Sequence, residues 1–286
     1  MSRIAYVNGR YLPQREAVVN IEDRGYQFAD GVYEVVHLYR DRFIDTDRHM
    51  ARLERSLREI RLTPPMGCDA MLHVLREVAR RNRVSEGILY MQVTRGVSRR
   101  DHGFPTKPVP PSMVVTVRRG PPYPTDIEKW AVSAITHPDQ RWARCDIKGI
   151  GLLANVLAKQ AARDRGAAEA WFVDDLGLVT EGASSNAWII DKTGALRTRD
   201  TQANILRGIT RKTLLEVIGH EGLTLEERAF TPQEAKEARE AFITGAGTLV
   251  LPVVKVDGAV LGDGKPGPVA KRLRQLYIEE ARRTAW

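Results

Sequence analysis

Short alternating apolar runs and longer runs with helical spacing follow one another along the 286 residues. Near the start, apolar residues flank Asn8-Gly9, a dipeptide that tolerates the positive φ angles of a tight turn and therefore predicts a hairpin. Residues 32–39 are rich in β-branched and aromatic side chains, which predicts a strand that returns through 43–44. Helical spacing then predicts two amphipathic helices, 48–62 and 71–79. Two more strands follow, 88–94 and 113–117.

Three prolines interrupt this pattern in the segment GPPYPT, residues 120–125. Because proline lacks a backbone N–H donor and cannot continue a central strand, we expect a linker at 120–126. It divides an N-terminal α+β domain, 1–119, from a C-terminal α/β domain, 127–286. In the second domain the pattern predicts strands and helices in mixed order, hence a two-domain α/β (α+β mixed) fold: strands 130–136, 170–173, 178–180, 187–190 and 242–256, and helices 155–165, 211–218 and 266–283.

Composition narrows the class of protein. Charged residues make up 28% and hydrophobic residues 43% of the chain, which is typical of a globular protein and excludes disorder for most of the chain. The longest apolar stretch is about nine residues, whereas a membrane-spanning helix needs about 20, so no span is expected. The polar N-terminus lacks the apolar core of a signal peptide, and the separated Cys68 and Cys145 fit neither a redox pair nor a disulfide framework. We expect a cytoplasmic protein with free thiols.

The net charge of +8 raises the question of an anionic partner. Arginines and acids are interleaved over 40–61, which favours a solvated helix face and no nucleic-acid partner. A basic nucleic-acid-binding protein without catalysis is the alternative from another functional class, and it predicts affinity that falls steeply with salt.

Four segments carry candidate chemistry, and the first holds Lys148. This lysine lies among small and apolar residues, from Ile147 to Leu153. Burial disfavours the charged amine, and a neutral lysine is a nucleophile that forms Schiff bases with carbonyl groups. A lysine that reaches from an apolar strand to water fits the same local pattern.

The other three segments suit a charged ligand. Glu181 follows a predicted strand and could pair with a protonated ring nitrogen, although an acid in a solvated hairpin looks the same. Gly208 precedes a helix start at which free N–H groups and the Thr210 hydroxyl could face an anion, or could simply form a capped helix. The glycine-rich loop 244–248 could bring backbone amides to a phosphate.

Metal and hydrolase chemistry lack a pattern. The cluster Asp45, Asp47 and His49 matches no zinc or calcium spacing, so no metal is expected. The chain has no G-x-S-x-G or Walker motif, which removes support for a hydrolase or a nucleoside triphosphatase.

The four segments in this order resemble the pyridoxal-phosphate enzymes of fold-type IV, which are the D-amino acid and branched-chain aminotransferases together with aminodeoxychorismate lyase. The resemblance covers nearly the whole chain and is closest to the D-amino acid branch. Three long segments carry it: 21–36 (IEDRGYQFADGVYEVV), 93–105 (VTRGVSRRDHGFP) and 141–148 (RWARCDIK).

The resemblance implies that pyridoxal 5′-phosphate is the cofactor and that Lys148 holds it covalently and moves the proton at the substrate Cα. It implies that Glu181 pairs with the pyridine nitrogen. The remaining matched residues would bind the cofactor or, in the last three cases, the substrate carboxylate: Arg52, Leu206, Gly208, Ile209, Thr210, Gly245 and Ala246, then Tyr33, Arg100 and His102. Gly245 and Ala246 depart from the family pattern, because relatives carry hydroxyl residues there.

By the same resemblance we expect ping-pong transamination between D-amino acids, such as D-alanine and D-glutamate, and 2-oxo acids, such as 2-oxoglutarate and pyruvate. A branched-chain L-aminotransferase and an aminodeoxychorismate lyase are the alternatives within the fold. A homodimer is expected, with Lys148 from one chain and the Arg100–His102 loop from the other completing each site.

Overall fold

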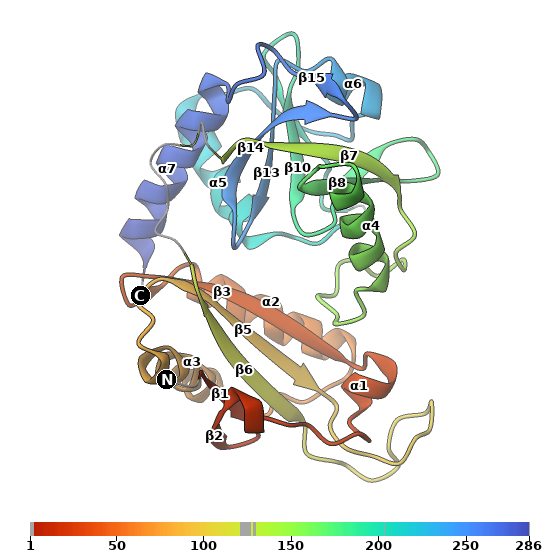
Figure 1. The fold of residues 1–286 in the computed structure, drawn as a ribbon, viewed down its shortest axis with the longest axis vertical. Coiled ribbons are helices and arrows are strands. Elements are labelled where there is room, and N and C mark those ends of the chain that lie inside the picture. The colour runs from red at the N-terminus through yellow and green to blue at the C-terminus, as the bar shows by residue number, and fades with distance from the viewer. Residues whose placement is uncertain (1–2, 121–126, 128–129, 203, 286) are drawn as a thin grey trace. The chain divides into compact units, whose positions relative to one another are not determined.

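The computed structural model describes residues 3–120, 127, 130–202 and 204–285. The chain divides into two compact units (Figure 1): unit 1 contains Met1–Tyr123, Ile147–Gly151 and Thr284–Trp286, and unit 2 contains Pro124–Asp146 and Leu152–Arg283. Apart from Gly120, the predicted linker 120–126 lies outside the described residues and stays a prediction.

The segment around Lys148 differs from the expectation, because it groups with unit 1 and not with the C-terminal part of the chain. The reason is backbone pairing beside the strand that begins at Gly31. The Tyr33 N–H donates to the Lys148 carbonyl at 3.0 Å, and the Ile150 N–H donates to the Gly31 carbonyl at 3.2 Å.

Unit 1 contains an antiparallel sheet of six strands in the order β2-β1-β6-β5-β3-β4. Asn8 and Gly9, with φ of 45° and 90°, form the predicted first turn. The strands are β1 Ile4–Val7, β2 Arg10–Pro13, β3 Gly31–Tyr39, β4 Arg42–Phe43, β5 Gly87–Thr94 and β6 Ser112–Arg119, and a short helix, α1 Arg24–Phe28, precedes β3.

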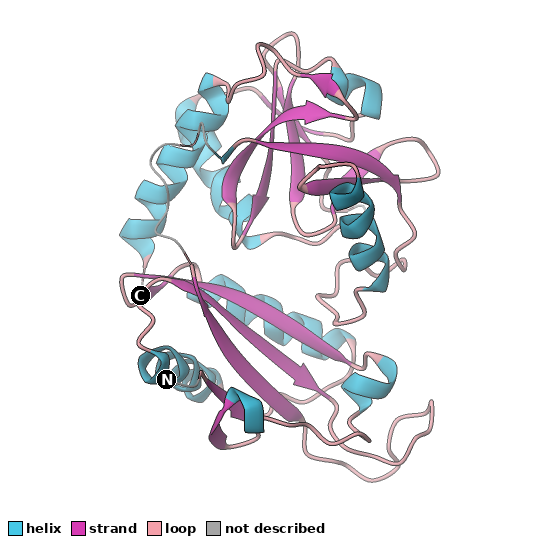
Figure 2. Ribbon diagram, in the orientation of Figure 1, coloured by secondary structure: helices cyan, strands magenta, loops and turns pink. Residues whose placement is uncertain are grey.

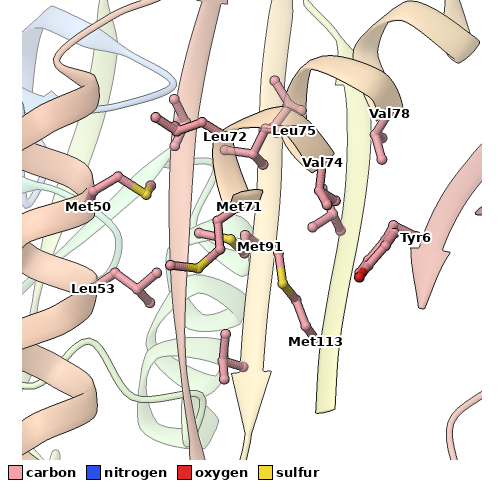
Figure 3. Close-up of a cluster of buried hydrophobic side chains, with 14 of the residues drawn as sticks. Tyr6, Met50, Leu53, Met71, Leu72, Val74, Leu75, Val78, Met91 and Met113 are labelled. Atoms are coloured by element: carbon pink, nitrogen blue, oxygen red, sulfur yellow. The ribbon is translucent and has the colours of Figure 1, made fainter. Parts of the chain in front are cut away.

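The two predicted amphipathic helices are α2, Thr46–Glu59, and α3, Cys68–Asn82. They cover one face of this sheet (Figure 2) and bury a cluster rich in leucine, valine and methionine (Figure 3). Alternate residues of β3, β5 and β6 point into that cluster, so the period of two in the strands meets the period of three to four in the helices. The opposite face of the sheet is only partly buried.

Unit 2 contains a mixed sheet in the order β12-β11-β10-β13-β14-β7-β8-β9, with β15 paired to β14. Its strands are β7 Val132–Pro138, β8 Glu169–Val173, β9 Val179–Gly182, β10 Asn186–Ile190, β11 Leu196–Thr198, β12 Leu225–Glu227, β13 Glu240–Gly245, β14 Leu249–Val256 and β15 Ala259–Val260. Its helices are α4 Leu153–Asp164, α5 Ile209–Glu221, α6 Pro232–Lys236 and α7 Pro268–Thr284.

The predicted mixed α/β class is confirmed, and most predicted elements agree with the structure to within a few residues. The sequence did not predict α1, α6, β11 or β12. The single strand predicted over 242–256 is wrong, because the chain turns at 246–248 and the two halves, β13 and β14, pair antiparallel. Within the described part of the chain, no helix is both long and apolar enough to cross a membrane.

Candidate active site

Lys148 lies on a short segment beside β3. Its backbone N–H donates to the Ser56 hydroxyl at 3.3 Å. Its Nζ lies 4.2 Å from the centroid of the Tyr33 ring, a cation–π distance, and the Tyr33 ring lies 5.5 Å from that of Tyr90. The structure therefore brings together Lys148 and Tyr33, two residues selected from the sequence. Lys148 as a whole is partly buried.

Arg52 projects from α2 toward the buried carboxylate of Glu34 on β3. Arg52 donates to Glu34 from Nε at 2.7 Å and from Nη2 at 2.8 Å, and His49 Nδ1 lies 2.8 Å from the same carboxylate. Burial alone would raise the pKa of Glu34, but the charge and hydrogen bonds of Arg52, with His49, hold that pKa well below its usual range. Glu34 thus fixes the direction of the Arg52 guanidinium.

Arg100 and His102 lie on the exposed loop that follows β5, and both contact the ring of Phe28. The Arg100 guanidinium carbon lies 4.6 Å from the centroid of that ring, and the His102 ring centroid lies 5.3 Å from it. The contacts described for unit 1 join these two side chains to Phe28 but not to Tyr33.

Glu181, on β9 of unit 2, accepts hydrogen bonds from three directions. The Arg141 guanidinium pairs with it closely, and the Asn186 amide and the Leu206 N–H each donate to it at 3.1 Å. Arg141 also forms a two-bond pair with Asp139, at 2.9 and 2.8 Å. Burial alone would lower the pKa of Arg141, yet Asp139 and Glu181 raise it above its usual value, so the guanidinium is permanently charged.

Asn186 connects Glu181 to the turn before α5. Its amide donates to the Leu206 carbonyl at 3.2 Å, and a Cβ at Gly208 would lie 2.1 Å from its Oδ1. Glycine is therefore required at Gly208 by the close approach of this side chain. Asn186 also pairs with Thr244, the residue before Gly245, in the β10–β13 ladder. The Asn186 side chain thereby contacts the turn 206–208, while its backbone, in β10, pairs with the residue that precedes the loop after β13.

The start of α5 offers donors to an anion. Gly208 is the N-cap of this helix and makes no side-chain cap, so the first N–H groups, from Ile209 and Thr210 onward, have no side-chain acceptor at the cap. Thr210 is buried. α5 is 13 residues long, and the uncapped N-terminus of such a helix suits a phosphate dianion.

The predicted loop after β13 is a tight hairpin. A Cβ at Gly245 would lie 3.2 Å from the Thr248 Oγ1 and 3.4 Å from the Ser184 carbonyl, so the glycine leaves room for both. Thr248 Oγ1 is buried and has no hydrogen-bond partner among the described residues. The hydroxyl groups expected at Gly245 and Ala246 in relatives are absent here, while Thr244 accepts a hydrogen bond from Trp188 Nε1 at 2.9 Å.

Three features of unit 2 fit a phosphorylated cofactor with a cationic ring. They are the fixed carboxylate of Glu181, the uncapped start of α5, and Gly208, a position where any side chain would collide with Asn186. The family model described as amino-transferase class IV matches residues 31–256, most of the chain. The chain belongs to the class IV aminotransferases. The fold-type IV resemblance predicted from the sequence is thereby confirmed.

Similar proteins agree with this assignment. The chain is 40% identical over 278 residues to a D-alanine aminotransferase of Staphylococcus haemolyticus, covering 96% of this chain and 97% of the relative. It is 41% identical over 269 residues to a D-alanine aminotransferase of Bacillus licheniformis, covering 93% of each.

Among solved structures, a branched-chain amino acid aminotransferase from Escherichia coli has a TM-score of 0.87 at 22% identity and covers 98% of this chain and 95% of its own. A branched-chain aminotransferase of Thermoproteus uzoniensis with norvaline has a TM-score of 0.86 at 26% identity, covering 100% and 99%. These likenesses confirm the fold of this class IV aminotransferase.

Four charged or polar residues that surround the predicted site residues were not predicted as their partners. Glu34 and His49 lie at Arg52, and Asp139 and Arg141 lie at Glu181. His49 and Arg52 are three residues apart on one helix face, a spacing that could have indicated a shared acceptor. No local signal connects Arg141 to Glu181, because 40 residues separate them.

Proposed function

We propose that this class IV aminotransferase uses pyridoxal 5′-phosphate to exchange amino groups between D-amino acids and 2-oxo acids in two half-reactions. D-alanine and D-glutamate are the donor type, and 2-oxoglutarate and pyruvate the acceptor type. The observation that carries the proposal is the identity of 40% and 41% to two D-alanine aminotransferases over nearly their whole lengths.

Lys148 of unit 1 holds the cofactor covalently and moves the proton at the substrate Cα. The bound cofactor supplies an aldehyde carbon that takes up the amino group and a ring that accepts the electrons released at Cα. The Tyr33 ring, 4.2 Å from the Lys148 Nζ, supports this role because a cation–π contact holds the amine beside β3. Tyr33, Arg100 and His102 bind the substrate carboxylate, which selects the handedness of the donor.

Glu181 would pair with the ring nitrogen, and its three donors fix the orientation of its carboxylate. Ile209 and Thr210 at the start of α5 would hold the phosphate, and Arg52 would supply a positive charge to it. The remaining cofactor contacts follow the matched family positions: Leu206 would pack on the ring, and Gly208, Gly245 and Ala246 would also contact the cofactor.

A homodimer is the proposed assembly. Leu153, Val156 and Leu157 are 72%, 59% and 55% exposed and lie on one face of α4, which is unusual for a helix that water alone would cover. In this assembly the Arg100–His102 loop serves the site of the other chain. The free thiols Cys68 and Cys145 favour a reducing compartment, the cytoplasm.

A paired-donor assay tests the proposed reaction. Purified protein is given D-alanine, L-alanine or L-leucine with 2-oxoglutarate, and both the 2-oxo acid and the chirality of the glutamate are measured. A separate reaction contains aminodeoxychorismate alone. We expect turnover with D-alanine and formation of D-glutamate. L-leucine as the best donor would instead indicate a branched-chain enzyme, and cleavage of aminodeoxychorismate would indicate the lyase.

Co-refolding tests the assembly. Lys148→Ala chains are mixed with chains that carry both Arg100→Ala and His102→Ala, then unfolded and refolded together. Half of randomly formed dimers are mixed, and each mixed dimer has one site with both intact parts, so about a quarter of wild-type activity should return. If the loop serves its own chain, no activity returns beyond that of the two parents.

A further inference from the structure

Arg24 opens α1 and is 3% exposed, although it carries a charge. Its guanidinium donates to two consecutive main-chain carbonyls of the loop after β5: from Nη1 to Asp101 at 2.6 Å and from Nη2 to His102 at 3.3 Å. These residues are 77 and 78 positions away in the sequence. A buried cation is thus used to hold the backbone of an exposed loop.

Asp30 fixes the other side of the Arg24 guanidinium. It accepts from Arg24 Nε at 2.8 Å and, with both oxygens, from Arg95 Nε and Nη2 at 2.7 and 2.9 Å. Arg95 in turn donates to the carbonyls of Ile60 and Arg61, just after α2. Arg24, Asp30 and Arg95 form a set of hydrogen-bonded side chains that we call the clamp. The clamp is therefore anchored to the end of α2 and not only to the loop.

Main-chain contacts align the same two segments. The Arg24 N–H donates to the Gly96 carbonyl at 2.9 Å, and the Ser98 N–H donates to the Glu22 carbonyl at 3.2 Å. The Phe28 ring, which Arg100 and His102 contact, also lies 4.9 Å from the Arg24 guanidinium carbon. Arg24 consequently determines both the backbone and the side-chain platform of this loop.

We propose that Arg24 is a positioning residue that holds the 100–102 loop in the conformation that receives the substrate carboxylate. This inference rests on the proposed function of Arg100 and His102. A loop whose side chains are exposed has few packing contacts to order it. Without Arg24, the side chains of Arg100 and His102 would have to be ordered each time a substrate binds, which weakens binding. The cost appears in substrate binding and in the choice between D and L donors, and not in cofactor binding.

The test compares wild type with Arg24→Ala, Arg24→Lys and a control, Arg99→Ala, which removes an exposed arginine of the same loop. KM and kcat are measured for D-alanine and 2-oxoglutarate, together with the cofactor Kd, the D-to-L ratio of alanine turnover, and the rate of tryptic cleavage after residues 99 and 100. For Arg24→Ala we expect KM to rise about tenfold or more for both substrates, as loss of charged hydrogen bonds predicts. The cofactor Kd should stay within about twofold, and the D-to-L ratio should fall.

Arg24→Lys should recover only part of the loss, because a single ammonium cannot reproduce the planar fork that reaches Asp30 and two carbonyls. Millimolar guanidinium should lower the KM of Arg24→Ala but not that of wild type. Tryptic cleavage of the loop should accelerate in Arg24→Ala at residue 100, whereas Arg99→Ala should leave KM unchanged.

Two failures are distinguishable. A wild type that does not act on D-alanine refutes the proposed function and, with it, the role of Arg24 in substrate binding. An active wild type with unchanged KM and unchanged loop cleavage in Arg24→Ala refutes the inference alone, as does a parallel loss of kcat and cofactor affinity. If Arg24→Ala does not fold, the Arg24→Lys kinetics and Asp30→Asn, which removes the charge that orients Arg24, decide the matter by the same KM and cleavage criteria.

Discussion

Replacing Arg141 with methionine removes the cation that joins Asp139 to Glu181. The three side chains are 7%, 11% and 6% exposed. Removing one partner of a buried ion pair costs about 3–5 kcal/mol, because the remaining charge is left buried without compensation. We expect Arg141→Met to lower the free energy of unfolding by that amount near pH 7.5.

The loss should depend on pH. Burial alone would raise the pKa of Asp139, and the hydrogen bonds and charge of Arg141, with Thr180, lower it below its usual value. In wild type this carboxyl therefore stabilises the fold above about pH 4, and that contribution is lost as the pH falls through its depressed pKa. In Arg141→Met burial dominates, the pKa of Asp139 rises, and the folded state binds a proton that the unfolded state does not.

The destabilisation consequently grows as the pH rises above about 4, by up to about 1.4 kcal/mol per pH unit until the raised pKa is passed. Urea unfolding of the holoenzyme, followed by tryptophan fluorescence at one protein concentration, measures it at pH 5 and 7.5. The matched control is Arg144→Met, which removes a two-bond pair with Asp146 from an arginine that is 48% exposed and should cost less than about 1 kcal/mol. Equal losses in the two variants, or a loss that does not change with pH, would show that Arg141 does not compensate the buried charges of Asp139 and Glu181.

Three further outcomes follow from single contacts. Burial raises the pKa of the Cys145 thiol to about 11, so its reaction with a disulfide reagent at pH 8 should be more than about 100-fold slower than in the unfolded chain; a rate near that of the unfolded chain would contradict this. Gly208→Ala places a Cβ 2.1 Å from the Asn186 Oδ1, so it should cost about 1–3 kcal/mol of stability and weaken cofactor binding. The control Gly219→Ala has open space in the same helix and should increase stability by up to about 1 kcal/mol. Thermal unfolding and cofactor titration of both variants test this. Glu240 accepts the first N–H groups of α7 at 3.1 and 2.9 Å, so Glu240→Ala should cost about 0.5–2 kcal/mol in urea unfolding and speed amide exchange in α7, and unchanged exchange would exclude the capping role.

Elements whose cause is local could be predicted from the sequence. The turn at Asn8-Gly9 requires positive φ, which this dipeptide tolerates, and α2 and α3 follow from apolar spacing within single helices. The strands β11 and β12 have three residues each and pair in parallel between Leu196 and Leu225. Their existence depends on a partner distant in the sequence, which no local pattern contains.

The candidate site divides in the same way. Lys148, Glu181 and Gly208 could be selected because a lone lysine in apolar surroundings, an acid after a strand and a glycine before a helix are local patterns. The group that orients Glu181 could not be predicted, because Arg141 lies 40 residues away in the sequence. Arg24 likewise reaches the Asp101 carbonyl of the loop after β5 across 77 residues. The placement of Lys148 beside β3 in unit 1 likewise depends on backbone pairing with Tyr33.

The identity of the residue that holds the cofactor tests the account most directly. The holoenzyme is reduced with borohydride, which makes the link between the cofactor and its amine permanent, and the labelled peptide is sequenced by mass spectrometry. We expect one phosphopyridoxyl group, on Lys148, and we expect Lys148→Ala to bind cofactor without a reducible link and not to turn over D-alanine. A label on another lysine, or a Lys148→Ala protein that keeps the covalent link and its D-alanine activity, would contradict it.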